Sequence, residues 1–207
     1  ACLMNCFEYQ FELKDYTDYI VASSFLVPGW GGDYTVLTNK LAGCNEDTES
    51  ALKEYNKACV EQWDKNFGDE TVESFTDMTV VRTRGLDAFG QKVRSFTDKL
   101  LQVYQSSDEK RSAVNTATAN ALKVYRDMPF YDLFIYGVML AAKAPELEAP
   151  YFEMKNCYDN ECLGAHQTCA YLRAQGINGS ILLGWEGQYE DINWQYDKGS
   201  WGFSESD

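Results

Sequence analysis

Apolar residues in the first thirty positions follow first a helical and then a strand period. They recur every three or four residues from Leu3 to Leu13, which predicts a helix. The run Tyr19–Ala22 is short and rich in β-forming residues, which predicts a buried strand. Segment 27–32 has three glycines and a proline, so it cannot be regular structure. A loop that follows a buried strand is a common place for functional side chains.

Downstream of this loop the pattern predicts further helices and strands. We expect helices over 33–41, 48–63, 86–104 and 112–126, strands over 78–82 and 179–183, and a buried apolar helix over 130–144. Segment 151–175 is mixed and gives no clear period. Strands that alternate with helices over the first hundred residues predict an α/β layered fold with a mostly parallel sheet.

Composition and charge exclude several classes of function. The 207 residues are 45% hydrophobic, enough for a sizeable core in one large domain or two small ones. The net charge of −14 argues against nucleic acid and anionic membrane surfaces, because both partners require a basic surface. No window approaches 18 apolar residues, so we expect no transmembrane helix.

The chain has seven cysteines and one histidine. Six of the cysteines could form disulfides, or they could be buried thiols, and the sequence leaves both readings open. A zinc site is a weaker alternative, because the spacings of its four candidate ligands miss the usual knuckle. Those candidates are Cys157, Cys162, Cys169 and His166.

Cys2 is the candidate nucleophile. It directly precedes the helix predicted from Leu3, and the unpaired N–H groups and dipole at a helix start lower the pKa of a thiol. An N-terminal-nucleophile hydrolase is an unfavoured alternative, because Ala1 occupies the position which that chemistry requires.

Several short stretches resemble the clostripain-like cysteine peptidases in order and spacing. They are Ala1-Cys2-Leu3-Met4, Phe7-Glu8-Tyr9, Tyr19-Ile-Val-Ala-Ser23, Pro28-Gly29, Gly31, Asp33 and Tyr34. The resemblance covers about residues 1–43. It is weaker over 78–104, and beyond 106 little is recognisable.

The resemblance implies a caspase-like, three-layer α/β/α fold of which this chain supplies the C-terminal portion. Residues 1–105 would belong to the catalytic domain, and 106–207 would form an additional, mainly helical region with a late strand, packed on it. Cys2 would be the nucleophile of a cysteine endopeptidase. Its histidine partner would come from an upstream light chain, separated from this chain by self-cleavage. His166 as the base contradicts the family order, in which the histidine precedes the cysteine, so a structural or surface role is favoured for it.

The family also suggests where the substrate binds. Cleavage after Arg or Lys requires a carboxylate in the primary pocket, and the resemblance places part of its wall at 23–33. The candidate substrate-binding residues are Ser23, Trp30 and Asp33, although Asp33 could instead cap the next helix and Trp30 could simply pack the loop. Ser24, Phe25 and Trp30 stand where family members often have acidic or polar residues, which weakens the case for strict basic specificity.

The remaining expectations also follow from the family. No cofactor is required by the sequence, and calcium is an option by resemblance, although no run matches an EF-hand loop. The expected partners are the light chain and a peptide or protein substrate, and the expected location is secreted or in a bacterial cell envelope. The competing hypothesis is a catalytically inactive binding or scaffold domain of the same fold.

Overall fold

The computed structural model describes residues 4–25, 27–29, 31–42, 47–67, 76–122, 130–169 and 182–184. The first half contains α1 (Phe7–Leu13), β1 (Tyr19–Ala22), α2 (Tyr34–Ala42), α3 (Thr48–Phe67), β2 (Asp77–Arg82), η2 (Thr83–Gly85) and α4 (Leu86–Ser106). The second half contains α5 (Asp108–Leu122), β3 (Phe130–Asp132), α6 (Leu133–Lys143), η4 (Pro145–Leu147), α7 (Glu148–Cys157), η5 (Tyr158–Cys162), β4 (Leu163–Thr168) and β5 (Leu182–Gly184). Most of the predicted helices and strands are therefore confirmed to within a few residues.

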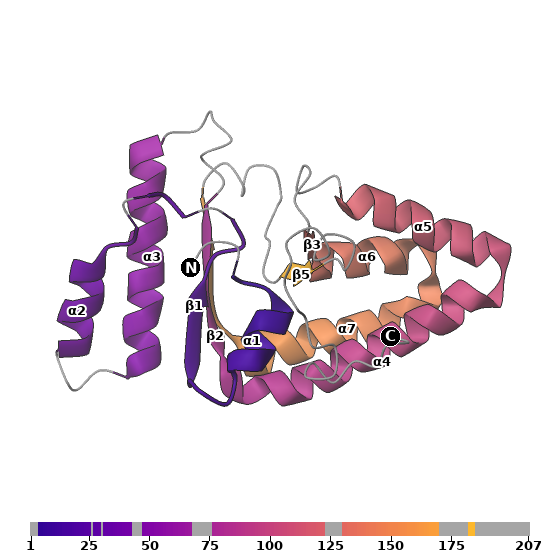
Figure 1. The fold of residues 1–207 in the computed structure, drawn as a ribbon, viewed down its shortest axis with the longest axis horizontal. Coiled ribbons are helices and arrows are strands. Elements are labelled where there is room, and N and C mark those ends of the chain that lie inside the picture. The colour runs from indigo at the N-terminus through magenta and orange to yellow at the C-terminus, as the bar shows by residue number, and fades with distance from the viewer. Residues whose placement is uncertain are drawn as a thin grey trace, which may run out of the picture.

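The larger described sheet has the order β1-β2-β4, and both of its strand pairs are antiparallel. The second sheet, β3 with β5, is antiparallel too. The α/β class is confirmed, but the expectation of a mostly parallel sheet is not confirmed by the strands that the structure describes. The reason is the connection from β1 to β2. A single helix would return the chain for a parallel strand, whereas here α2 and α3 run in opposite directions and together reverse it (Figure 1).

Helices cover both faces of the β1-β2-β4 sheet. On one face α3 contributes Tyr55, Cys59, Val60 and Trp63, which pack with Met78 of β2. On the other face Val81 of β2 joins a large core that includes residues of α1, α4, α5, α6 and α7. Figure 1 shows the same arrangement, with α2 and α3 on one side of the strands and α1, α4 and α7 on the other. Successive β2 residues face opposite layers, as the strand period requires.

Aromatic rings connect the helices of the larger core. Phe7 of α1 meets Phe89 of α4 edge to face at 5.3 Å between ring centroids, and Phe89 lies 5.1 Å from Tyr158 of η5. Tyr158 lies 5.2 Å from Phe134 of α6. Such pairs add stabilisation beyond the buried area. This core joins residues on both sides of position 105, while the division at that position stays a prediction.

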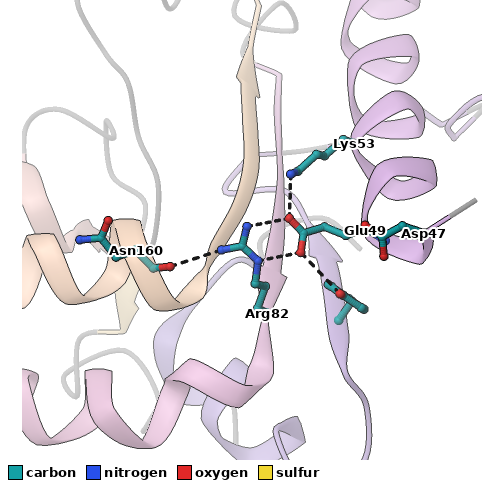
Figure 2. A network of polar contacts seen from close by, with 6 residues as sticks. Asp47, Glu49, Lys53, Arg82 and Asn160 are labelled. Carbon is teal, nitrogen blue, oxygen red and sulfur yellow. Dashed lines mark hydrogen bonds and ion pairs between the residues drawn. The ribbon is translucent and has the colours of Figure 1, made fainter.

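A partly buried ion pair joins strand β2 of the sheet to helix α3, which covers one of its faces. The guanidinium of Arg82 in β2 donates to both carboxylate oxygens of Glu49 in α3, with Nε–Oε2 at 2.7 Å and Nη2–Oε1 at 2.6 Å. Lys53 Nζ lies 2.7 Å from Oε1 of the same carboxylate, and Arg82 Nη1 donates to the Asn160 carbonyl of η5 at 3.5 Å (Figure 2). Together these cations lower the pKa of Glu49 to about 2, with Arg82 as the largest cause.

The first helix begins later than the sequence predicted. Cys6 is extended, with φ −116° and ψ 137°, and α1 starts at Phe7 rather than Leu3. The prediction that Cys2 lies directly at a helix start is therefore wrong, and so is the dipole argument for its low pKa. Instead, the backbone N–H of Asn5 donates to the Ser23 carbonyl at 3.2 Å and joins this segment to the end of β1.

Among the described helices, none is both long and apolar enough to span a membrane.

Candidate functional site

Four segments meet at one end of the β1-β2-β4 sheet. Because both strand pairs are antiparallel, the end of β1, the start of β2 and the end of β4 lie at the same end of the sheet. Ala22 pairs with Thr79, and Asp77 pairs with Thr168. The fourth segment is residues 4–5. The hydrogen bond from Asn5 N–H to the Ser23 carbonyl attaches it to this end of the sheet. The segment that carries Cys2 thus enters the described structure at the end of β1.

Asp77 holds the turn that follows β1. Its Oδ1 accepts hydrogen bonds from the Ser23 hydroxyl at 2.7 Å, from Ser24 N–H at 2.7 Å and from Phe25 N–H at 3.3 Å. The carboxyl group is fully buried, and its Oδ2 has no partner among the described residues. Burial raises the pKa of Asp77 to about 6, although the bonds from Ser23 and Ser24 oppose that shift. One buried carboxylate therefore fixes the start of the predicted substrate loop.

Asn5 connects the same turn to the middle strand. Its side-chain Nδ2 lies 2.9 Å from Ser24 Oγ and 3.0 Å from Thr79 Oγ1, and its Oδ1 accepts from Gln10 Nε2 of α1 at 2.5 Å. Both Asn5 and Gln10 are fully buried. Buried polar groups are stable only when they find partners, so this network requires the four side chains to keep one arrangement.

His166 belongs to this network. It lies opposite Thr79 in the β2–β4 pairing, and its Nδ1 is 2.7 Å from Thr79 Oγ1. Its Nε2 is buried and has no partner among the described residues. Burial, with a smaller contribution from Lys155, lowers the pKa of His166 to about 4, so the ring is neutral at pH 7. A structural role for this histidine stays a prediction, because Cys2 lies outside the described residues.

The loop after β1 is anchored at its far end by α2 and α3. Asp33 Oδ1 accepts from Thr35 N–H at 3.1 Å and Val36 N–H at 3.2 Å, so this carboxylate caps α2. The Trp63 indole donates to the Gly31 carbonyl at 2.9 Å. Gly31 has φ +74°, a conformation that favours glycine. The loop is thus fixed at both ends, by Asp77 and by α3.

The predicted site residues have different outcomes. Cys2 and Trp30 lie outside the described residues. Ser23 is buried and bonded to Asp77, and Asp33 caps α2, so the structure places both beside the predicted loop. Whether they contact substrate stays a prediction. Sequence reasoning missed Asn5, Asp77 and Thr79, whose signal is weak: each is a single polar residue next to an apolar run.

Four of the cysteines settle the disulfide alternative among themselves. Cys6, Cys59, Cys157 and Cys162 are all in the thiol form, so disulfides among them are not present. Burial raises the pKa of each of these four thiols, to about 12 for Cys162 and further for Cys6, where Glu8 adds to the effect. These thiols are therefore poor nucleophiles.

Metal binding finds no support in the described part of the chain. No group of three or more His, Cys, Asp or Glu side chains there is placed to hold an ion, and the predicted zinc ligand His166 faces Thr79. Asp159, an acidic residue of η5, is paired with Lys155 at 2.5 Å. The described residues do not fit a calcium site.

Comparison with known proteins gives one family match. The model described as the clostripain family matches residues 1–185. The search among curated protein sequences found no match.

Several solved structures share the fold at low sequence identity. A clostripain from Bacteroides thetaiotaomicron in complex with the peptide inhibitor BTN-VLTK-AOMK aligns with a TM-score of 0.62 at 14% identity, over 97% of this chain and 83% of that chain. An inactive zymogen protease from Parabacteroides distasonis aligns with a TM-score of 0.63 at 15% identity, over 97% of this chain and 55% of that one. A secreted cysteine protease from Bacteroides thetaiotaomicron, bound to an irreversible peptide inhibitor, aligns with a TM-score of 0.55 at 16% identity. In that case the alignment covers 90% of this chain and 48% of the other.

Proposed function

The chain belongs to the clostripain family, and from this premise we propose that it is the nucleophile-bearing part of a cysteine endopeptidase with Cys2 as the attacking thiol. The observation that carries the proposal is that residues 4–5, which follow Cys2 in the sequence, are joined to the end of β1. Asn5, three residues after Cys2, is bonded to Ser23 and Ser24 there. Three peptide units span at most about 11 Å, so the connection to Asn5 allows the proposed nucleophile to reach the start of the predicted substrate loop.

The proposed mechanism needs a base that this chain does not offer. His166 is the single histidine of the sequence, and it is buried, neutral and bonded to Thr79. We therefore assign the base to a histidine on the upstream light chain. That imidazole assists the thiol of Cys2 and later protonates the leaving amine. The oxyanion is held by backbone N–H groups, that of Cys2 among them.

Primary specificity for Arg or Lys is the finer part of the proposal. In its support, the inhibitor bound to the Bacteroides thetaiotaomicron clostripain contains the peptide VLTK, which ends in lysine. Asp33 is the described carboxylate on the predicted loop, and it also caps α2. Asp33→Asn separates these roles, because Asn caps a helix about as well as Asp. If Asp33 contacts the substrate cation, the variant loses kcat/KM for lysine peptides at unchanged stability.

Export to the outside of a bacterial cell is the location we propose, and a relative described as secreted supports it. Calcium dependence stays open to a simple test, the activity before and after treatment with EDTA.

Peptide cleavage by the assembled protein, with both chains present, tests the proposed function. We expect cleavage after lysine or arginine, and a loss of at least about 1,000-fold in kcat for Cys2→Ala. Cys157→Ala is the matched control, because Cys157 is a half-buried thiol in α7 with a raised pKa, and it should keep wild-type activity. An assembled wild-type protein that cleaves no peptide would favour the inactive binding domain. A Cys2→Ala variant that cleaves normally would show that Cys2 is not the nucleophile.

A further inference from the structure

We propose that Asn5 is a positioning residue, which holds the nucleophile segment in register with the start of the substrate loop through Ser24 and Thr79. This inference rests on the proposed function, because it concerns the placement of Cys2. Asn5 itself touches neither substrate nor reacting atoms in this account. It acts through the three-residue connection to Cys2.

Three side chains surround the Asn5 amide. Its NH₂ group has two hydrogens, and Nδ2 lies 2.9 Å from Ser24 Oγ and 3.0 Å from Thr79 Oγ1. Its oxygen accepts from Gln10 Nε2 at 2.5 Å. The buried amide therefore has partners at both its nitrogen and its oxygen.

The polar contacts continue from Asn5 across the sheet. Thr79 Oγ1 lies 3.0 Å from Asn5 Nδ2 and 2.7 Å from His166 Nδ1, a contact in which the tautomer decides which atom donates. Thr79 therefore connects the amide of Asn5 with the imidazole of His166 in β4.

This network of hydrogen bonds has a consequence for the placement of the nucleophile. Asn5 bonds through its backbone to Ser23 and through its side chain to Ser24 and Thr79, so the segment is attached to both β1 and β2. The same turn is held from its other side by Asp77. Residues 4–5, which follow the proposed nucleophile in the sequence, and the turn after β1 consequently share one buried support. A displacement of about 1 Å at a catalytic group can lower the rate by about 100-fold.

Steady-state kinetics and alkylation of Cys2 in the assembled protein test the proposal. The variants are Asn5→Ala, which removes the amide, Thr79→Val, which removes the hydroxyl at similar shape, and Thr79→Ser, which keeps it. Asn56→Ala is the matched control, because Asn56 is also fully buried but donates to the Met78 carbonyl from α3. The readouts are kcat, KM, the rate at which iodoacetamide modifies Cys2, and the melting temperature.

We expect Asn5→Ala and Thr79→Val to lower kcat by about 10- to 100-fold, with KM changed much less, and to alter the alkylation rate of Cys2. Thr79→Ser should restore both values. Asn56→Ala should lower the melting temperature alone. The proposal is overturned if Asn5→Ala and Thr79→Val keep wild-type kcat and alkylation, or if Asn56→Ala lowers kcat equally. Alkylation needs no substrate, so it tests the placement of Cys2 even if the wild-type protein cleaves no peptide, a result that would count against the proposed function alone.

Discussion

The Ser23 hydroxyl donates a 2.7 Å hydrogen bond to Asp77, a residue 54 positions later in the sequence. The same carboxylate oxygen accepts the backbone N–H groups of Ser24 and Phe25. A turn at the end of β1 is thus fixed by the first residue of β2. The relation connects the predicted substrate loop to the middle strand of the sheet.

Removal of this carboxylate should be costly. Asp77→Ala removes the acceptor of the buried Ser24 N–H and one of two partners of both Phe25 N–H and the Ser23 hydroxyl. We expect a loss of about 2–4 kcal/mol in the free energy of unfolding. Asp77→Asn keeps an acceptor oxygen and should lose less than half of that. Urea unfolding of the two variants measures the difference. Equal losses would show that the charge, and not the acceptor, holds the turn.

The pH dependence of stability should carry opposite contributions from Asp77 and His166. Asp77 has a raised pKa of about 6, so between pH 6 and its unfolded value near 3.8 the folded state binds more protons than the unfolded state. Its contribution to stability therefore grows as the pH falls through that window. His166 has a lowered pKa of about 4, so its contribution is lost as the pH falls from 6.5 towards 4.

Single substitutions can separate the contributions of Asp77 and His166 to the pH dependence of stability. Relative to the wild type, Asp77→Asn should lose stability more steeply between pH 6 and 4, and His166→Gln should lose it less steeply. Urea unfolding at half-unit steps of pH measures both slopes. Parallel curves for the wild type and either variant would contradict the pKa assigned to that group.

The ion pair of Arg82 with Glu49 should contribute measurable stability, unlike an exposed pair. Its two hydrogen bonds are short and its side chains are mostly buried, so Glu49→Gln should cost about 1–3 kcal/mol. The control is Glu61→Gln, because Glu61 and Lys57 form an exposed pair at 3.7 Å that should be worth less than about 0.5 kcal/mol.

Acid provides a second check of the same pair. The pKa of Glu49 is about 2, so its contribution is present above pH 4.5 and is lost as the pH falls from 4.5 towards 2. The difference in stability between the wild type and Glu49→Gln should shrink across that window. A difference that stays constant there would contradict the lowered pKa.

Two glycines of the loop after β1 should tolerate substitution differently. A Cβ atom at Gly32 would clash with the Tyr55 hydroxyl and lie 2.6 Å from Cys59 Sγ, whereas at Gly29 it would meet nothing within 4 Å. We expect Gly32→Ala to displace the loop from α3 and to raise KM for peptide substrates several-fold. Gly29→Ala is the matched control and should keep the wild-type KM. A Gly32→Ala variant with normal KM would show that the position of this loop does not affect substrate binding.

Much of the fold follows from periodicity alone. Strand Tyr19–Ala22 and helix Leu86–Ser106 lie where their apolar patterns predicted them, because each packs one face on the core. Strand Leu163–Thr168 was not predicted. Its residues, among them Gly164 and His166, have no strong strand preference. The strand pairs closely with β2 because Gly164 has no side chain. A Cβ atom at Gly164 would lie 3.1 Å from the Val80 carbonyl oxygen.

The site was predictable to a smaller degree. The motif at Cys2 and the loop after β1 are visible as local patterns, which is why the family could be named from them. Asn5, Asp77 and His166 are far apart in the sequence and carry no pattern that marks them as neighbours. Their network depends on the antiparallel register of β1, β2 and β4. The sequence predicted both helices between β1 and β2, but the expectation of a parallel sheet did not take into account that two helices reverse the direction of the next strand.

The position at which a substrate-like inhibitor attaches tests the central claim most directly. A lysine-terminated peptidyl chloromethyl ketone should label the assembled protein once, at Cys2, as located by mass spectrometry of the digested chain. Cys6, Cys59, Cys157 and Cys162 should stay unlabelled, because burial raises their pKa. Attachment at any of these four, or no attachment to Cys2 under conditions in which peptides are cleaved, would contradict the assignment of Cys2 as the nucleophile.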